Sequence, residues 1–316
     1  MTDAAPRLTI GVFCHNHAAF IEECLASIDI KDAVEVVITD DGSRDSTREV
    51  IEAAVPSLVL RGYRVQTNLD PENRGFVARL NSFLSSMSGD RFILLSGDDR
   101  FAPGGIGRLM TAADENPTAD IVFSRFGRCD QFGADIDNAG AQKRYEDLGR
   151  RYLRPGNPLL DLMSSGSFVA GGCTLVNSVF VREHGLLFNT MLANAEDYDF
   201  WLQCSSAGAR FVYVAERCWD HRVLPTSKYY SAGPERLRSE LTAIGRHRPG
   251  APAAVRLGGL VWGLQIWKGQ CVRGPKGERV GAREVAGLLH TNVASVFASV
   301  PLVAAQSVAR RIRGWR

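Results

Sequence analysis

The feature that most constrains the fold is an alternation of short apolar segments with helical patterns across the first half of the chain. The apolar segments at 8–14, 34–39 and 92–95 have the length of strands, and each is followed by polar or acidic residues. Between the first two, residues 20–30 carry apolar side chains at helical spacing. Because strands that alternate with helices form βαβ units, the pattern predicts an α/β fold with a mostly parallel, doubly wound sheet that helices cover on both faces. Further helices are expected at 47–54, 76–87 and 105–115, and further strands at 63–67, 120–124 and 211–214.

The composition changes near residue 234, where a basic and helical region begins. We therefore predict two domains, an α/β domain over residues 1–233 and a helical extension over residues 234–316. Within the first domain, residues 127–158 are rich in Gly, Asp and Arg and have no regular apolar pattern, so a loop or flap is expected there.

The C-terminal segment 285–309 contains no Asp, Glu, Lys or Arg, and four arginines follow within residues 310–316. As a helix, this segment is long enough for a bilayer span, but its polar stripe makes it a poor one. Two interpretations stay open. The segment either packs against the rest of the chain or lies on a membrane surface with the arginines against anionic lipid.

The overall composition narrows the class of protein. A formal net charge of +2 gives no support to nucleic-acid binding. The seven cysteines are scattered without a Cys-x-x-Cys motif, which fits neither a disulfide framework nor a zinc site. The polar segment 1–7 leads directly into the first expected strand, so we expect no secretory signal and a cytoplasmic location.

Three acidic turns mark expected strand ends or helix starts. They are Asp40-Asp41, Asp98-Asp99 and Glu196-Asp197. Each alone could be a simple turn or cap, because Asp is common in both. In an open α/β sheet, however, ligands bind outside the carboxyl ends of the strands. Since Mg²⁺ and Mn²⁺ prefer carboxylate and phosphate oxygens, the three turns together predict a site for one of these cations and a phosphate-bearing ligand. No Gly-x-Gly-x-x-Gly follows the first strand, so a classical dinucleotide site is not expected.

Four motifs that include these turns follow one another along the chain. They are Asp40-Asp41-Gly42-Ser43, Asn73-Arg74-Gly75 with Ala78-Arg79-Leu80-Asn81, Ser96-Gly97-Asp98-Asp99, and Glu196-Asp197-Tyr198-Asp199. In order and spacing, this set resembles family 2 glycosyltransferases, which have the GT-A-type nucleotide-diphospho-sugar transferase fold. The resemblance implies an inverting enzyme that moves one sugar from a nucleotide-diphosphate sugar, most often a UDP-sugar, to an acceptor hydroxyl. The chain lacks the Gln-x-x-Arg-Trp signature of processive synthases, so we expect single-sugar addition.

The resemblance also implies which residues bind the nucleotide. Asp40 would bond the base, and His15 would stack on it where the family often has Tyr. Asp98 would face the ribose or the sugar. The remaining expected nucleotide contacts are Phe13, Asn16, Asp41, Asn73, Arg74 and Arg79.

By the same resemblance, Asp99 would hold Mn²⁺ or Mg²⁺. Many family members have Asp where this chain has Ser96, so the metal site has one carboxylate fewer. His221 is either a second metal ligand near the diphosphate or an exposed loop histidine. Asp197 would be the general base that takes the acceptor proton, since an ordinary Asp pKa of about 3.9 leaves it ionised at neutral pH. Glu196 would orient Asp197 or touch the acceptor.

The expected acceptor is a glycan or a lipid-linked oligosaccharide at the inner face of the cell membrane, with residues 285–316 as a peripheral membrane contact and no nucleic-acid partner. Two alternatives remain. A sugar nucleotidyltransferase also uses metal-bound carboxylates, but it normally has a Gly-rich signature where this chain has His15-Asn16-His17. A catalytically inactive nucleotide- or carbohydrate-binding module is disfavoured, because Asp98, Asp99 and Asp197 are intact.

Overall fold

The computed structural model describes residues 6–136, 139–192, 194–224, 233–273 and 282–289. Its contacts group the chain into two compact units. The first contains residues 1–157, 168–188 and 207–225, and the second contains 158–167, 189–206 and 226–316. The division at residue 233 into two domains stays a prediction.

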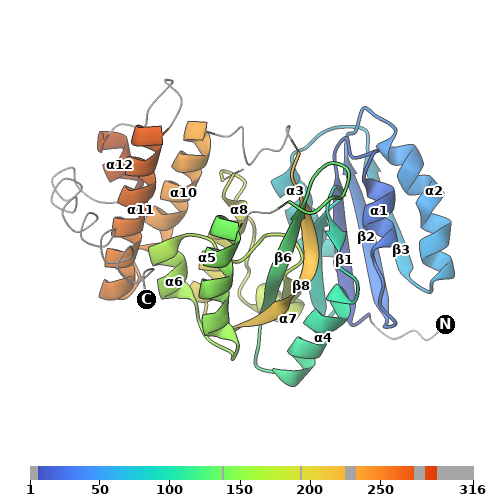
Figure 1. The fold of residues 1–316 in the computed structure, drawn as a ribbon, viewed down its shortest axis with the longest axis horizontal. Coiled ribbons are helices and arrows are strands. Elements are labelled where there is room, and N and C mark those ends of the chain that lie inside the picture. Colours follow the sequence, from blue (N-terminus) through green and yellow to red (C-terminus); the bar gives the residue numbers. More distant parts are fainter. Residues whose placement is uncertain (1–5, 137–138, 193, 225–232, 274–281, 290–316) are drawn as a thin grey trace. The chain divides into compact units, whose positions relative to one another are not determined.

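The first unit is built on an eight-stranded sheet with the strand order β3-β2-β1-β4-β7-β6-β8-β5 (Figure 1). Strands β1 to β4 pair in parallel, as do β6 and β8, whereas β7 and β5 are antiparallel to their neighbours. The predicted mostly parallel sheet is therefore confirmed, with two short antiparallel strands added. The strands are β1 Leu8–Cys14, β2 Val34–Asp41, β3 Arg64–Asp70, β4 Arg91–Ser96, β5 Arg100–Phe101, β6 Ile121–Cys129, β7 Leu175–Asn177 and β8 Phe211–Arg222.

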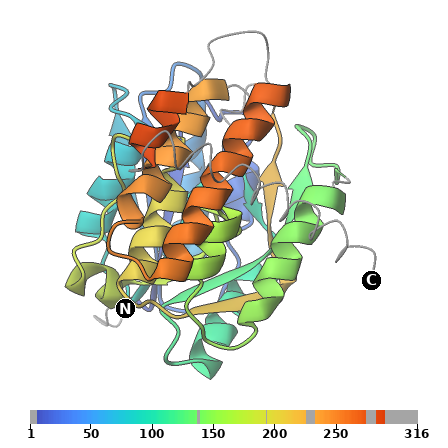
Figure 2. The ribbon, with the colours of Figure 1, turned by 90° about the vertical axis from the view of Figure 1, so that its left-hand side faces the viewer.

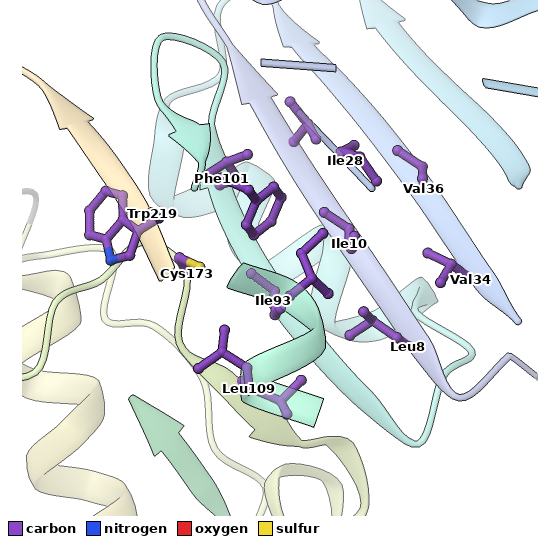
Figure 3. Packing of buried hydrophobic residues seen from close by; sticks show 14 of the residues in the cluster. Leu8, Ile10, Ile28, Val34, Val36, Ile93, Phe101, Leu109, Cys173 and Trp219 are labelled. Carbon is purple, nitrogen blue, oxygen red and sulfur yellow. The ribbon is translucent and has the colours of Figure 1, made fainter. Parts of the chain in front are cut away.

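Helices cover both faces of this sheet, because side chains alternate along each strand. Leu8 and Ile10 of β1 belong to a buried apolar cluster with residues of three helices on one face (Figure 3). Phe13 of the same strand packs on the other face, with its ring centroid 5.7 Å from that of Phe83. The helices of this unit are α1 Ile21–Ala26, α2 Thr47–Leu60, α3 Phe76–Ser86, α4 Gly105–Glu115, α5 Ala139–Gly149 and α7 Ser178–Glu183, with a 3₁₀ turn at Arg150–Tyr152.

One prediction for this unit is wrong. Residues 127–158 are not a loop, because β6 continues to Cys129 and α5 follows at Ala139–Gly149. Tertiary contacts stabilise this helix: the Tyr145 ring centroid lies 5.8 Å from that of Phe126, and Arg125 Nε lies 2.7 Å from a Glu146 carboxylate oxygen. The α5 sequence has few apolar residues, so no helical period identifies it.

The second unit is helical and consists of α6 Leu159–Ser165, α8 Glu196–Ser206, α10 Gly233–His247, α11 Ala253–Arg273 and α12 Ala282–Leu288. In this unit α10 packs against α8, α11 and α12. Figure 2 shows α10, α11 and α12 as the orange and red helices. None of the helices in the described part of the chain is both long and apolar enough to cross a membrane. Most of the predicted membrane-contact segment, residues 290–316, lies outside the described residues.

Candidate functional site

The parallel register brings three polar segments to one edge of the sheet. Cys14 at the end of β1 pairs with Asp40 of β2, and the preceding Phe13 pairs with Ser96 of β4. The segments that follow these strands therefore emerge side by side at the carboxyl edge. This is the edge at which the sequence predicts a ligand site.

The turn after β2 is held together by Asp40. Its side chain is fully buried and accepts hydrogen bonds from the Ser43 N–H at 3.0 Å, from the Ser43 hydroxyl and from Arg48 Nε at 2.9 Å. Gly42 has a φ of +72°, and a Cβ there would lie 2.5 Å from the backbone nitrogen of Asn73. The Asp-Gly-Ser motif is thus a closely packed turn. A bond from Asp40 to a base stays a prediction, and the buried carboxylate would have to become accessible to form it.

Asp41 fixes the loop that contains the Asn-Arg-Gly motif. Its carboxylate accepts the backbone N–H groups of Arg74 at 2.8 Å and Gly75 at 2.9 Å. Arg79 Nε donates to the same carboxylate at 2.7 Å. Burial lowers the pKa of Arg79, but its hydrogen bonds to Asp41 and Asp70 outweigh this effect and raise the pKa above the ordinary value. Arg79 therefore remains a cation at this edge.

His15 lies exposed after β1 with a defined tautomer. Its Nδ1 is 2.9 Å from the carbonyl oxygen of Asp41, which can only accept, so Nδ1 carries the hydrogen. The Asn16 amide nitrogen lies 3.1 Å from His15 Nε2 and donates to it. The Asn73 amide nitrogen is 3.3 Å from Nδ1, and because both atoms carry hydrogens in this tautomer, this contact is not a hydrogen bond. An imidazole held in this way offers a flat face for stacking on a base.

The turn after β4 contains the second Asp-Asp pair. Gly97 N–H donates to the Phe13 carbonyl at 2.8 Å, and Asp99 N–H donates to the Ser96 carbonyl at 3.0 Å. The Ser96 hydroxyl donates to the Asp98 carboxylate. Ser96, the position where many family members have Asp, therefore orients Asp98 in this chain.

Asp99 is buried against the end of β8. Its Oδ1 accepts the Arg222 N–H at 2.8 Å and lies 3.3 Å from His221 Nδ1, so Oδ2 can accept a further partner. Burial raises the pKa of Asp99 in spite of the neighbouring imidazole. Burial also lowers the pKa of His221, but the Asp99 carboxylate more than offsets this and raises it. His221 lies in strand β8, so the interpretation as an exposed loop histidine is wrong.

The Asp99–His221 pair has the donor atoms of a metal site but is incomplete by itself. The described residues contain no group of three or more His, Cys, Asp or Glu side chains arranged to hold a metal ion. Carboxylate oxygen and imidazole nitrogen both suit Mn²⁺, and Mg²⁺ and Mn²⁺ usually complete their coordination with substrate phosphates and water. The residues present therefore fit a cation that binds together with a diphosphate.

Arg222 is the residue that sequence reasoning missed. Its guanidinium is buried, and its Nε donates to the Asp98 carbonyl at 2.7 Å. One terminal nitrogen donates to the Asp130 carbonyl at 2.9 Å, and the other donates to the Glu23 carboxylate. The sequence carries no signal for this role, because an arginine at a strand end ordinarily extends into solvent.

The second unit carries the predicted catalytic pair, Glu196 and Asp197, in the first turn of α8. Asp197 accepts the Tyr198 N–H at 2.7 Å. Burial raises the pKa of Asp197, and this N–H and the charge of Arg236 lower it less than burial raises it. The structure thus brings the predicted nucleotide and metal residues together in the sheet unit and assigns the predicted acid–base residues to the helical unit.

Solved structures identify the class of this fold. The UDP-GlcNAc complex of S. aureus TarS is 16% identical, covers 85% of this chain and 74% of its own, and has a TM-score of 0.63. The mannosyltransferase PcManGT from Pyrobaculum calidifontis, in complex with GDP-Man and Mn²⁺, is 16% identical, covers 99% and 84%, and has a TM-score of 0.59. The fold is therefore of the GT-A type, as predicted.

Sequence comparison identifies the family. Residues 9–175 match the model of glycosyl transferase family 2, and the chain belongs to this family. It is 30% identical over 230 residues to the succinoglycan biosynthesis protein ExoU of Rhizobium meliloti. That alignment covers 68% of this chain and 61% of ExoU, so the chain matches less than two thirds of this relative's length.

Proposed function

We propose that this chain is an inverting glycosyltransferase that transfers a single sugar from a nucleoside-diphosphate sugar to an acceptor hydroxyl. The observation that carries the proposal is the contact of the buried Asp99 with His221 beside the Ser96–Asp98 turn, in a chain of glycosyl transferase family 2. TarS in complex with UDP-GlcNAc supports UDP as the first nucleotide to test, and PcManGT with GDP-Man supports GDP as the second.

On the donor side, His15 would stack on the base, because the residue is exposed and its two ring nitrogens are held by Asp41 and Asn16. Asp41 would act through the loop that it holds, by keeping Arg74 and Arg79 near the nucleotide. Asp98, oriented by Ser96, would accept hydrogen bonds from the ribose or the sugar.

Asp99 and His221 would hold Mn²⁺ or Mg²⁺ in the presence of the diphosphate. A bound divalent cation would neutralise the charge that develops on the leaving diphosphate. Metal dependence is part of the proposal, and the Mn²⁺ in the PcManGT complex supports it.

In the transfer step, the acceptor oxygen attacks the anomeric carbon on the side opposite the leaving group. A new carbon–oxygen bond forms, the bond to the diphosphate oxygen breaks, and its electron pair leaves with the nucleoside diphosphate. Asp197 would take the proton of the acceptor hydroxyl, and Glu196 would orient Asp197 or contact the acceptor. A raised pKa makes Asp197 a stronger base than an ordinary carboxylate.

We further propose a glycan or lipid-linked acceptor, which the name of ExoU supports for a related chain. Residues 290–316 would bring the protein to the inner face of a membrane, whereas Val285, Ala286 and Leu289 at the start of the predicted segment are buried in the protein. Deleting residues 290–316 should then reduce binding to anionic lipid vesicles at low salt, because the segment carries the C-terminal arginines. Unchanged vesicle binding would contradict the membrane part of the proposal only.

The donor is tested by the thermal stability of the purified chain with UDP, GDP, TDP and CMP, each with and without Mn²⁺. A ligand that binds only the folded state raises Tm by mass action. We expect a Mn²⁺-dependent rise with one nucleoside diphosphate, followed by release of that diphosphate from its sugar ester. Release of pyrophosphate from a nucleoside triphosphate and a sugar 1-phosphate would instead indicate a nucleotidyltransferase, and no shift with any nucleotide would indicate an inactive module.

A further inference from the structure

A short turn follows β6 and is closed by Asp130. The Asp130 carboxylate accepts the N–H groups of Phe132 at 2.8 Å and Ala134 at 2.9 Å. The Asp130 carbonyl accepts the Gly133 N–H at 3.1 Å. Gly133 has a φ of +82°, and a Cβ there would lie 2.9 Å from an Arg100 nitrogen. The backbone conformation of residues 130–134 is therefore defined by its own hydrogen bonds.

Two arginines attach this turn to the turn that carries the metal-site carboxylate. Arg222 donates from one terminal nitrogen to the Asp130 carbonyl at 2.9 Å and from Nε to the Asp98 carbonyl at 2.7 Å. Arg100, directly after Asp99, donates to the Gly133 carbonyl at 3.0 Å. Arg222 and Arg100 therefore link the two turns.

The burial of Arg222 makes this attachment more than a surface contact. Its side chain is only 1% exposed, and burying a cation is unfavourable unless every donor is satisfied. The Glu23 carboxylate supplies the opposite charge, and the Phe20 ring lies 4.9 Å from the guanidinium carbon. Removing either carbonyl partner would leave buried donors without an acceptor. The position of the 130–134 turn is thus tied to that of Asp98.

This turn presents one large apolar side chain to solvent. Phe132 is 83% exposed, while the residues on either side of it in the turn are polar or Gly. A single exposed apolar side chain is ordinary on a protein surface. Phe132 is unusual because the buried Arg222 guanidinium attaches its turn to the turn that contains Asp98.

We propose that Phe132 is an acceptor-binding residue whose ring packs against the apolar face of an acceptor sugar. A pyranose presents C–H groups on its faces and hydroxyls around its edge, so a flat, uncharged ring can cover one face while the hydroxyls stay hydrated. The hydrogen bonds of Arg222 and Arg100 would keep the Phe132 turn in a fixed position relative to the turn after β4. The inference rests on the proposed glycosyltransferase function and extends it by naming an acceptor contact.

The test is saturation-transfer NMR on the full chain with UDP and Mn²⁺ present. The probes are the methyl glycosides of glucose, galactose, mannose and N-acetylglucosamine, and saturation is applied to the aromatic protons of the protein. We expect transfer to the ring C–H protons of at least one sugar. Phe132→Ala should weaken that sugar's binding about tenfold, whereas Phe132→Trp should keep it. Leu60→Ala is the matched control, because Leu60 is 88% exposed at the end of α2.

The inference is overturned if the wild-type chain binds none of the four sugars, or if Phe132→Ala binds them as the wild type does. It is also overturned if Phe132→Ala loses binding to phosphatidylglycerol vesicles but keeps sugar binding, because Phe132 would then be a lipid contact. The Tm rise with UDP and Mn²⁺, measured on each variant, separates the two proposals. If the wild type shows no rise with any nucleotide, the proposed function fails as well.

Discussion

Two Asp-Asp pairs stand at the carboxyl ends of β2 and β4, and their surroundings differ. In the β2 turn, the chain itself satisfies both carboxylates through backbone N–H groups and arginines. In the β4 turn, Asp99 is just as buried, but its pKa is raised by burial and an imidazole lies beside it. The Asp-Asp pair after β2 therefore stabilises a turn, whereas in the pair after β4 Asp99 can still accept a ligand.

The first turn of α8 repeats this contrast within the helical unit. Asp199 is fully buried, 3.1 Å from His247 Nε2 and 3.3 Å from Arg246 Nε, and it accepts from Gln203 at 2.8 Å. It joins α8 to α10. Asp197, two residues earlier, has a pKa raised by burial. In both units, the carboxylate that the chain satisfies is structural, and the less satisfied one is the candidate for chemistry.

The largest expected effect is on Asp197. Asp197→Asn should lower kcat about 10²–10⁴-fold with little change in Tm or in nucleotide binding, because it removes only the group that takes the proton. The matched variant Asp199→Asn should instead lower Tm, since it breaks a buried ion pair. Unchanged turnover in Asp197→Asn would contradict the assignment of the base.

The contrast between the two sheet turns is tested most directly by replacing a buried carboxylate of each turn with an amide. Asp99→Asn should lower turnover about 10²–10³-fold and abolish the Mn²⁺ dependence of nucleotide binding, because it removes an anionic ligand of the cation. Its Tm should hold or rise, since a carboxylate whose pKa is raised by burial is unfavourable when ionised.

Asp40→Asn should instead lower the stability of the fold. It leaves Arg48 without its carboxylate partner, and we expect a loss of about 1–2 kcal/mol of unfolding free energy, since Arg48 is partly exposed. Chemical denaturation of both variants measures the difference. Equal losses of stability in Asp99→Asn and Asp40→Asn would refute the contrast between the turns.

The pH dependence of turnover sharpens the assignment of the base. A general base must be ionised, and burial raises the pKa of Asp197 above the ordinary value. As the pH falls, Asp197 therefore takes up its proton earlier than an exposed Asp would, and the acid limb of kcat/KM should lie at higher pH than about 4. A rate that stays constant down to pH 4 would exclude Asp197 as a base with a raised pKa.

The attachment of the two turns is tested by Arg222→Lys. Lysine keeps the charge but lacks the planar fork that reaches Asp98, Asp130 and Glu23 together. We expect about a tenfold loss of kcat/KM and a fall in Tm. Arg182→Lys, at an exposed position on α7, should change neither quantity.

The smallest expected effect is at Ser96. Ser96→Ala removes the hydroxyl that orients Asp98, and a few-fold rise in the Kd for UDP is expected because one hydrogen bond contributes about 1 kcal/mol. Ser96→Asp should destabilise the chain without metal and increase the Tm rise on adding Mn²⁺ with UDP. Calorimetric titration with UDP measures the first variant, and thermal unfolding measures the second.

Local sequence patterns determined the framework of this protein. The first strand, Leu8–Cys14, and the helix Gly105–Glu115 have the predicted bounds, because apolar periodicity depends only on neighbouring residues. The position of the acidic pairs at strand ends was equally predictable. The antiparallel strands β5 and β7 were not, because segments of two and three residues show no period.

Only the tertiary structure decided what each acidic residue does. Asp40 and Asp99 both follow apolar strands, and nothing in their immediate neighbours shows that one meets Arg48 and the other His221. The contact of Asp98 with Arg222 joins residues 124 positions apart in the chain. Such partners are set by strand order and register, which bring distant segments to one edge of the sheet, and burial there shifts the pKa values that decide the chemistry.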